Sequence, residues 1–335
     1  MEEKGNYMTK RNSNIELFRF ILMIGICIWH MFVHGFNIKD IGINESFVNK
    51  EYLIYCSLLV PFVNCFMLIS GFFGIKYTPY KVIKFIIQAN FYYWLCFLIN
   101  YLYSFNLSVE TFLYALPIST RLWWFLTDYF IILLLSPFIN EGINKIDKKI
   151  YGFLLLSLIF INSIGLYITR YSLGSNLLSL LILYLLGRYM NKYNLVLNIK
   201  QALCTWFFTT IILISIIIFS LDISTKFTWL LFSYNNPLII IQAISLLSFV
   251  LSFDKKDFKP FIFLGGNCFA IYLLTEGIGL KLYKYWSYLY INNSILAISI
   301  IFISCILITT LNIAQNKFNN FIYRNIASYW KTYIK

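Results

Sequence analysis

Five ionisable side chains lie inside long apolar runs of this sequence, where a charged group is costly: Glu16, Arg19, His30, Asp128 and Glu276. Such residues commonly have a functional or a pairing role. A histidine beside a carboxylate suits general-base chemistry, because the carboxylate fixes the tautomer and stabilises the imidazolium while the other nitrogen accepts a proton. We therefore predict that His30, supported by Asp128 or Glu276, removes a proton from an acceptor group.

The first apolar run carries a cation at one end and an imidazole near the other. Arg19 and His30 are 11 residues apart, which in a helix is a rise of about 16 Å and close to three turns, so both side chains share one face. Glu16 is one turn before Arg19 and can neutralise it. In the alternative interpretation, Glu16 and Arg19 are an interfacial anchor pair and His30 is a packed core residue. Carboxylates at the depth of His30 favour the chemical role.

Depth in the membrane relates the three candidate catalytic residues. His30, Asp128 and Glu276 each fall five or six residues inside the external end of their apolar runs. At 1.5 Å per residue, all three are expected roughly 7–10 Å below the external boundary. Asp128 has an alternative partner in Arg121, and Glu276 has one in Lys281 or could line a polar acceptor pocket. The sequence leaves these alternatives open.

Two further features, His34 and the segment 265–267, indicate a site less strongly. His34 follows His30 by one turn and is expected at the water boundary, as a supporting or surface residue. Gly265, Gly266 and Asn267 could form a turn that approaches a phosphate. Glycine pairs at helix ends more often serve packing or kinks, and we favour packing.

The apolar runs themselves predict an all-α, polytopic integral membrane protein. Of the 335 residues, 60% are hydrophobic and 12% are charged, against roughly 25% charged in soluble proteins. Too few polar residues are present to cover a soluble globule. Runs that can cross about 30 Å of hydrocarbon as helices predict about ten transmembrane spans. They are 15–35, 53–73, 83–104, 122–140, 151–169, 177–190, 202–221, 234–252, 261–281 and 294–312.

Basic residues predict the orientation of these spans. Nineteen of the 27 lysines and arginines fall on one side of the predicted membrane and seven on the other, with Arg19 inside the first span. The positive-inside rule therefore places both termini in the cytoplasm, with a short segment 1–14 before the first span and a tail 313–335 after the last. The same rule explains the net charge of +13, so we expect no nucleic-acid partner.

Other chemistries have little support in the sequence. There is no nucleophile elbow, no Walker loop, no zinc-protease motif and no acidic pair spaced for a metal. All seven cysteines lie in apolar runs without CxxC spacing, so we expect small buried side chains and no metal site. Every connection is short, and residues 1–335 are expected to form a single membrane-embedded domain. The oligomeric state is left open.

Several motifs together resemble the acyltransferase-3 family of bacterial membrane O-acyltransferases. The first is Arg19, ten residues and His30 within NSNIELFRFILMIGICIWH. The others, in order, are VPFVNCFMLISGFFG (60–74), RLWWFLTDYFIILLLSPFIN (121–140), LLGRYM (185–190) and GGNCFAIYLLTEG (265–277). Together they span most of the chain.

The resemblance implies a multi-pass enzyme of the bacterial cytoplasmic membrane, in contact with the lipid bilayer. It implies transfer of an acetyl or similar short acyl group from cytoplasmic acyl-CoA, with acetyl-CoA the expected donor, to a sugar hydroxyl of a cell-surface or exported polysaccharide. His30 would be the catalytic histidine, and Arg19, with Glu16, would serve donor binding. Many members have a histidine after the late Ile-Tyr-Leu; here Thr275 follows Leu274, so a second-histidine role would fall to Glu276.

One physical picture joins these expectations. The pantetheine arm of coenzyme A is comparable in length to the Arg19–His30 rise, and the basic loops and Arg19 would hold its phosphates. Trp123, Trp124 or Tyr272 would stack on the acceptor sugar. The alternative function is a transporter or flippase for a glycan or a lipid-linked sugar; such proteins usually distribute ionisable residues along a pathway and show internal repeats.

Overall fold

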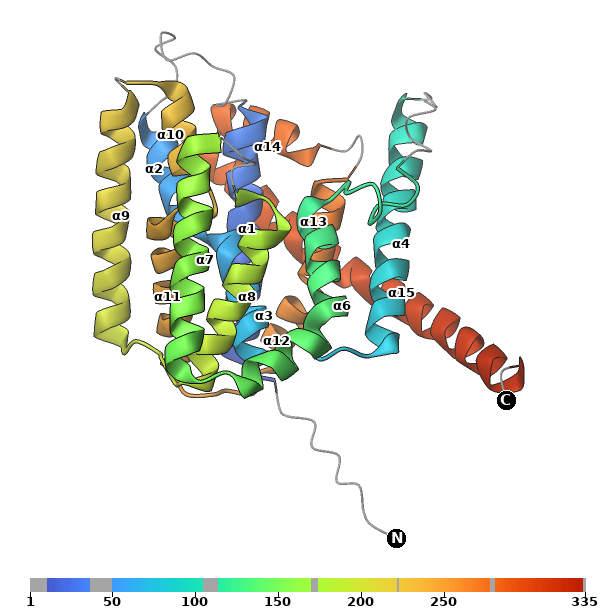
Figure 1. Cartoon of the computed structure of the whole chain (residues 1–335). Coiled ribbons are helices and arrows are strands. Elements are labelled where there is room, and N and C mark those ends of the chain that lie inside the picture. The colour runs from blue at the N-terminus through green and yellow to red at the C-terminus, as the bar shows by residue number, and fades with distance from the viewer. Residues whose placement is uncertain are drawn as a thin grey trace.

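The computed structural model describes residues 11–36, 50–104, 114–169, 174–221, 223–277 and 281–333, and within these ranges every regular element is a helix (Figure 1). The elements are α1 (Ser13–His30), the π-helix η1 (Met31–Gly35), α2 (Lys50–Leu59), α3 (Pro61–Phe73), α4 (Pro79–Ser104), α6 (Trp124–Lys145), α7 (Lys148–Thr169), α8 (Leu177–Lys192), α9 (Ile199–Leu221), α10 (Thr225–Leu231), α11 (Pro237–Leu251), α12 (Lys259–Asn267), α13 (Phe269–Thr275), α14 (Leu282–Asn292) and α15 (Ser294–Tyr333). Most of the predicted external connection 36–52, the N-terminal residues 1–10 and the last two residues lie outside the described ranges.

Each of the ten predicted spans coincides with helical structure, and six segments within the described residues are long and apolar enough to cross a membrane. These six are Ser13–Gly35, Glu51–Phe73, Pro79–Leu102, Trp124–Lys145, Ile199–Leu221 and Ser294–Ile322. The run 261–281 is divided between α12 and α13, and α8 and α11 have 16 and 15 residues. The chain is thus an all-helical, multi-pass membrane protein; ten crossings and cytoplasmic termini stay predictions.

The first helix occupies the interior of the bundle, whereas α9 lies at its edge (Figure 1). In the most apolar stretch of Ser13–Gly35, 67% of the residues are buried, against 28% for α9. Phe207, Phe208 and Phe219 of α9 are exposed, as expected of a surface that faces lipid. The helix that carries Arg19 and His30 is therefore held on several sides, by α2, α3, α12, α13 and α15 among others.

One close helix crossing explains two of the sequence motifs. Gly71 of α3 and Gly187 of α8 lie against each other's helix backbone, and a Cβ atom on either glycine would collide with backbone atoms. Small residues let membrane helices approach in this way. Gly71 of the second-span motif and Gly187 of LLGRYM therefore serve packing.

Two connections contain short helices. The segment 221–235, for which the hydropathy allows a loop or a re-entrant stretch, contains α10, which packs against α9. The connection before the last span contains α14, which packs against η1 and α15. Trp286 of α14 is buried while Tyr285 and Tyr288 are exposed, so α14 covers the end of the first span with one face.

Candidate active site

His30 and Glu276 meet where two helices end. His30 is the last residue of α1, and Glu276 follows the last residue of α13. His30 Nδ1 lies 2.8 Å from Glu276 Oε1, and the side chains are 12% and 22% exposed. Both atoms are buried and have no other hydrogen-bond partner in the described part of the chain. This contact occupies Nδ1 and leaves Nε2 of His30 as the nitrogen that can accept a proton.

The pair opens into a cavity of about 290 Å³, here called the histidine cavity. Five of the sequence-predicted site residues line it: His30, Trp123, Trp124, Tyr272 and Glu276. Its wall also contains an aromatic cluster from other elements and His34. These further lining residues include Trp29, Trp229, Phe232 and Tyr234. The cavity combines a histidine–carboxylate pair with aromatic faces, which suits a polar ring-shaped substrate that carries a hydroxyl group.

A second cavity, the arginine cavity, lies at the other end of α1. It has a volume of about 180 Å³ and is lined by Arg19, Ser70, Tyr129 and four phenylalanines, Phe66, Phe85, Phe125 and Phe269. One cation therefore faces an otherwise largely aromatic chamber. Such a site favours a ligand with an anionic group at one end and an apolar or extended part beyond it.

A narrow apolar pocket, here called the throat, shares lining side chains with both cavities. Its volume is about 40 Å³. It shares His30, Trp124, Tyr234 and Tyr272 with the histidine cavity and Phe66, Phe125 and Phe269 with the arginine cavity. Cavities lined by the same side chains are neighbours, and Met23 and Ile26 place the throat along α1 between Arg19 and His30.

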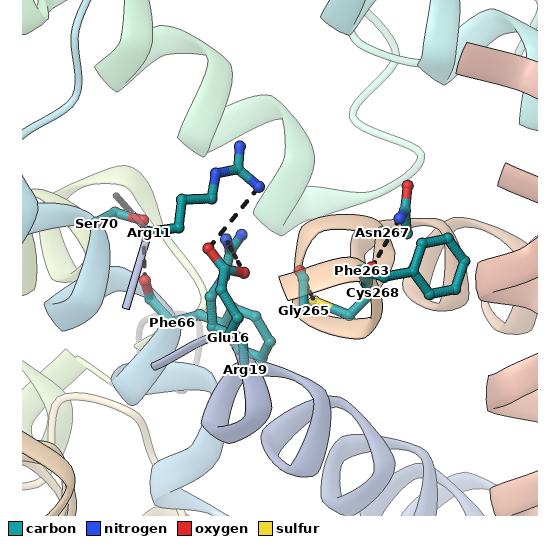
Figure 2. A network of polar contacts seen from close by, with 9 residues as sticks. All are labelled: Arg11, Glu16, Arg19, Phe66, Ser70, Phe263, Gly265, Asn267 and Cys268. Atoms are coloured by element: carbon teal, nitrogen blue, oxygen red, sulfur yellow. Dashed lines mark hydrogen bonds and ion pairs between the residues drawn. The ribbon is translucent and has the colours of Figure 1, made fainter. Parts of the chain in front are cut away.

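Arg19 is held in place by the first turns of α1 (Figure 2). Asn12 caps the helix through its side chain, which accepts from the N–H of Asn14. Glu16, whose side chain is 9% exposed, accepts a hydrogen bond of 3.2 Å from Arg19 Nη1 and lies 3.9 Å from Nη1 of Arg11. Glu16 does not line the arginine cavity. It orients Arg19 rather than facing the cavity itself.

Gly265 of α12 allows this end of α1 to pack closely. A Cβ atom at Gly265 would collide with the backbone of Glu16. The neighbouring Cys268 Sγ donates to the Gly265 carbonyl at 3.1 Å, and both residues lie beside Glu16 and Arg19 in Figure 2. Gly265 therefore has the packing role that the sequence favoured, and it packs against the backbone of Glu16.

Asp128 lies with Arg121, the alternative partner left open by the sequence. Arg121 Nη2 donates to Asp128 Oδ2 at 3.0 Å and to the carbonyl of Ser175 at 3.0 Å. The Asp128 side chain is 4% exposed and that of Arg121 is 48% exposed. The expectation that Asp128 supports His30 is therefore not met by the geometry, although its depth is suitable. Depth specifies one coordinate, whereas contact also requires that the two helices face each other.

His34 lies nearer to the chemistry than the sequence indicated. It belongs to η1, in which the first span widens to a π-helix, and its ring centroid is 5.4 Å from that of His30. The wider turn brings both rings to the histidine cavity. Single π-turns are often found at functional sites, but hydropathy does not reveal them, so the sequence carried no signal for this placement.

The phenylalanines shared by the throat and the arginine cavity were also missed as individual site residues. Phe66, Phe125 and Phe269 each lie in a motif that carries the family resemblance. Their position within these motifs was the sequence signal that could have identified them as site residues. In the described ranges, no group of three or more His, Cys, Asp and Glu side chains is arranged to hold a metal ion.

Comparison with known proteins agrees with the geometry. A family model described as an acyltransferase domain, that of the acyltransferase-3 family, matches residues 12–313, which is nearly the whole chain. Neither the curated proteins nor the solved structures provide a significant match. The matched region includes the His30–Glu276 contact, the throat and the arginine cavity. The chain belongs to the acyltransferase-3 family, and it is a multi-pass membrane protein with an acyltransferase domain.

Proposed function

We propose that this protein transfers an acetyl or similar short acyl group from acyl-CoA to a sugar hydroxyl of a cell-surface or exported polysaccharide, in the bacterial cytoplasmic membrane. The observation that carries the proposal is the 2.8 Å contact of His30 Nδ1 with Glu276 Oε1 at the junction of the throat and the histidine cavity. A paired imidazole at this junction can serve two substrates that arrive from opposite sides.

On the acceptor side, His30 acts as the general base. Nε2 takes the proton of the sugar hydroxyl while the hydroxyl oxygen attacks the thioester carbon. The tetrahedral intermediate then expels the coenzyme A thiolate, and the imidazolium returns the proton to the thiolate sulfur. Glu276 stabilises the imidazolium between these two steps and holds the reactive tautomer. Trp123, Trp124 and Tyr272, which line the cavity, offer faces on which a sugar ring can stack.

On the donor side, Arg19 faces the arginine cavity with Glu16 behind it. An arginine that is oriented by a carboxylate can bind a phosphate of coenzyme A through its remaining N–H groups. The pantetheine arm would then extend through the throat toward His30. Apolar side chains such as Met23, Ile26 and Val63 line the throat and would keep water from the thioester.

The size of the throat supports a short acyl group. Its volume is about 40 Å³, and Phe125, Phe269 and Trp124 bound it. A long acyl chain would have to displace these rings, whereas an acetyl group would not. The limited room beside His30 therefore supports a short acyl group rather than a long one.

The test is transfer by the purified full-length protein in lipid nanodiscs. Acetyl-CoA labelled in the acetyl group is supplied with an isolated cell-surface polysaccharide, and the label on the polysaccharide is measured. We expect label transfer by the wild type and none above background by His30→Ala that elutes as a folded protein. Transport of the glycan across the bilayer without acylation would instead favour a transporter or flippase and would overturn the proposal.

A further inference from the structure

A group of buried side-chain amides lies between α4, α12 and α15, outside the lining of the three cavities. We call it the amide cluster; of its members, Gln88, Asn312, Gln315 and Asn319 are buried, and Asn267 and Asn316 are half-buried. Asn312, Gln315 and Asn319 lie within one stretch of α15 and are at most 2% exposed. Buried amides in an apolar bundle destabilise the fold unless they have hydrogen-bond partners.

Half of the cluster is satisfied by hydrogen bonds between helices. Asn312 Oδ1 accepts from Tyr92 Oη at 2.9 Å and from Gln88 Nε2 at 3.4 Å. Asn267 Oδ1 accepts from Asn312 Nδ2 at 2.8 Å and from Asn316 Nδ2 at 3.0 Å. Such bonds join membrane helices, and they account for this half of the cluster without any ligand.

Five other amide atoms of the cluster have no partner in the described part of the chain. Both amide atoms of Gln315, both amide atoms of Asn319 and Oδ1 of Asn316 are buried without a hydrogen bond in the described part of the chain. Gln315 and Asn319 are one helical turn apart and share a face of α15. A role in joining helices does not explain them, because an unpaired buried amide destabilises the fold and an apolar side chain of the same shape would not.

The free atoms identify the chemistry of a ligand. A metal ion would use only the oxygens, and a phosphate would use only the N–H groups. A complete amide offers a donor beside an acceptor, which matches the donor and acceptor at adjacent positions on the edge of adenine; asparagine and glutamine read adenine in this way. Gln315 and Asn319 thus present two complete amides to a neutral base.

The amide cluster adjoins the Arg19 end of the substrate path. Asn267 ends α12, the helix whose Gly265 packs against the backbone of Glu16. Beyond Asn312, α15 leads away from the bundle past α4 (Figure 1). In this part, Ile313, Phe318 and Phe321 are exposed, so α15 is packed on one side only. Entry of a base between α15 and α4 would require this end of α15 to move, and not the core around His30.

We propose that Gln315 and Asn319 bind the adenine of the acyl donor. This inference rests on the proposed acyl transfer and makes the donor a coenzyme A thioester rather than the thioester of a carrier protein, whose phosphopantetheine arm has no adenine. Arg19 would bind a phosphate between the two ends of the donor. In the absence of a ligand, the unpaired amides would be a cost to stability that adenine binding offsets.

The experiment compares ligands on the full-length protein in nanodiscs by titration calorimetry. The ligands are coenzyme A, its analogue with hypoxanthine in place of adenine, and 4′-phosphopantetheine. We expect coenzyme A to bind at least about tenfold more tightly than either of the others, since one bidentate base contact is worth about that much. Equal affinity of the wild type for all three would overturn the adenine assignment without the need for any variant.

A variant then tests the two residues. In Gln315→Met combined with Asn319→Leu, the side chains keep their approximate shape and lose the amides. We expect about a tenfold loss in coenzyme A affinity, unchanged affinity for 4′-phosphopantetheine, and a ligand-free unfolding temperature equal to or above that of the wild type. Asn292→Leu on the exposed face of α14 is the matched control and should change none of these quantities.

Two results would contradict the inference in different ways. Unchanged coenzyme A binding in the double variant, whatever its stability, would show that these amides do not contact the donor. Acetyl transfer by the wild type would then still support the proposed function. A wild type that transfers an acyl group from no thioester would instead overturn the proposed function itself.

Discussion

His30 Nδ1 and Glu276 Oε1 lie 2.8 Å apart although the residues come from the first and the penultimate predicted spans. The contact depends on two helix ends. α1 continues as a π-helix after His30, and α13 stops at Thr275, so that Glu276 leaves the helix and faces the imidazole. A charge-stabilised imidazole is thereby held at the end of the throat, with Nε2 available to a substrate.

The first prediction separates the base from its partner. His30→Ala is expected to lower kcat by about 10²–10⁴-fold, the usual contribution of a general base. Glu276→Gln keeps the shape of the side chain but removes its charge, and we expect a loss of about 10²-fold or more because the imidazolium and its tautomer lose support. Initial rates of acetyl transfer measure both. Glu141→Gln, at an exposed carboxylate of α6, is the control and should transfer at the wild-type rate.

The second prediction concerns Asp128. Because Asp128 pairs with Arg121 and not with His30, Asp128→Asn should lower kcat less than tenfold, while it lowers the free energy of unfolding by about 1–2 kcal/mol through the loss of a hydrogen bond between charged groups. Arg121→Gln should have a similar effect, and the two changes should not add in a double-mutant cycle. A loss of activity in Asp128→Asn as large as that in Glu276→Gln would contradict this assignment.

The third prediction concerns the width of the throat. Phe125 lines both the throat and the arginine cavity, and Phe125→Ala should make room for a longer acyl chain. The ratio of kcat/KM for butyryl-CoA over acetyl-CoA should rise by about tenfold or more, as for methylene groups in other hydrophobic pockets. Phe207→Ala on the exposed face of α9 should leave the ratio unchanged. An unaltered ratio in Phe125→Ala would show that the throat does not select the acyl group.

The fourth prediction compares two glycines. A Cβ atom at Gly265 would collide with the backbone of Glu16, whereas at Gly142 it would meet nothing within 4 Å. Gly265→Ala should therefore lower the free energy of unfolding by about 1–3 kcal/mol through overpacking and raise the KM for the donor, because Glu16 orients Arg19. Gly142→Ala should instead stabilise the protein by about 0.4–1 kcal/mol. Thermal unfolding and donor saturation curves measure both effects.

The sequence by itself determined those features that depend on one helix at a time. Helical runs follow from the scarcity of charge and the length of apolar stretches, and the shared face of Arg19 and His30 follows from the geometry of one helix. The aromatic side chains of the histidine cavity could also be predicted, because Trp123, Trp124 and Tyr272 belong to motifs at the ends of spans that carry a candidate carboxylate. Each of these conclusions needs only one element and its depth.

Only the tertiary structure decided which carboxylate meets His30. Asp128 and Glu276 have the same expected depth, so hydropathy cannot distinguish them. The choice depends on how α1, α6 and α13 are rotated about their axes and packed, which results from many contacts far apart in the sequence. The same holds for the π-turn that brings His34 to the cavity and for the amides of α15, whose burial against α4 leaves Gln315 and Asn319 without partners.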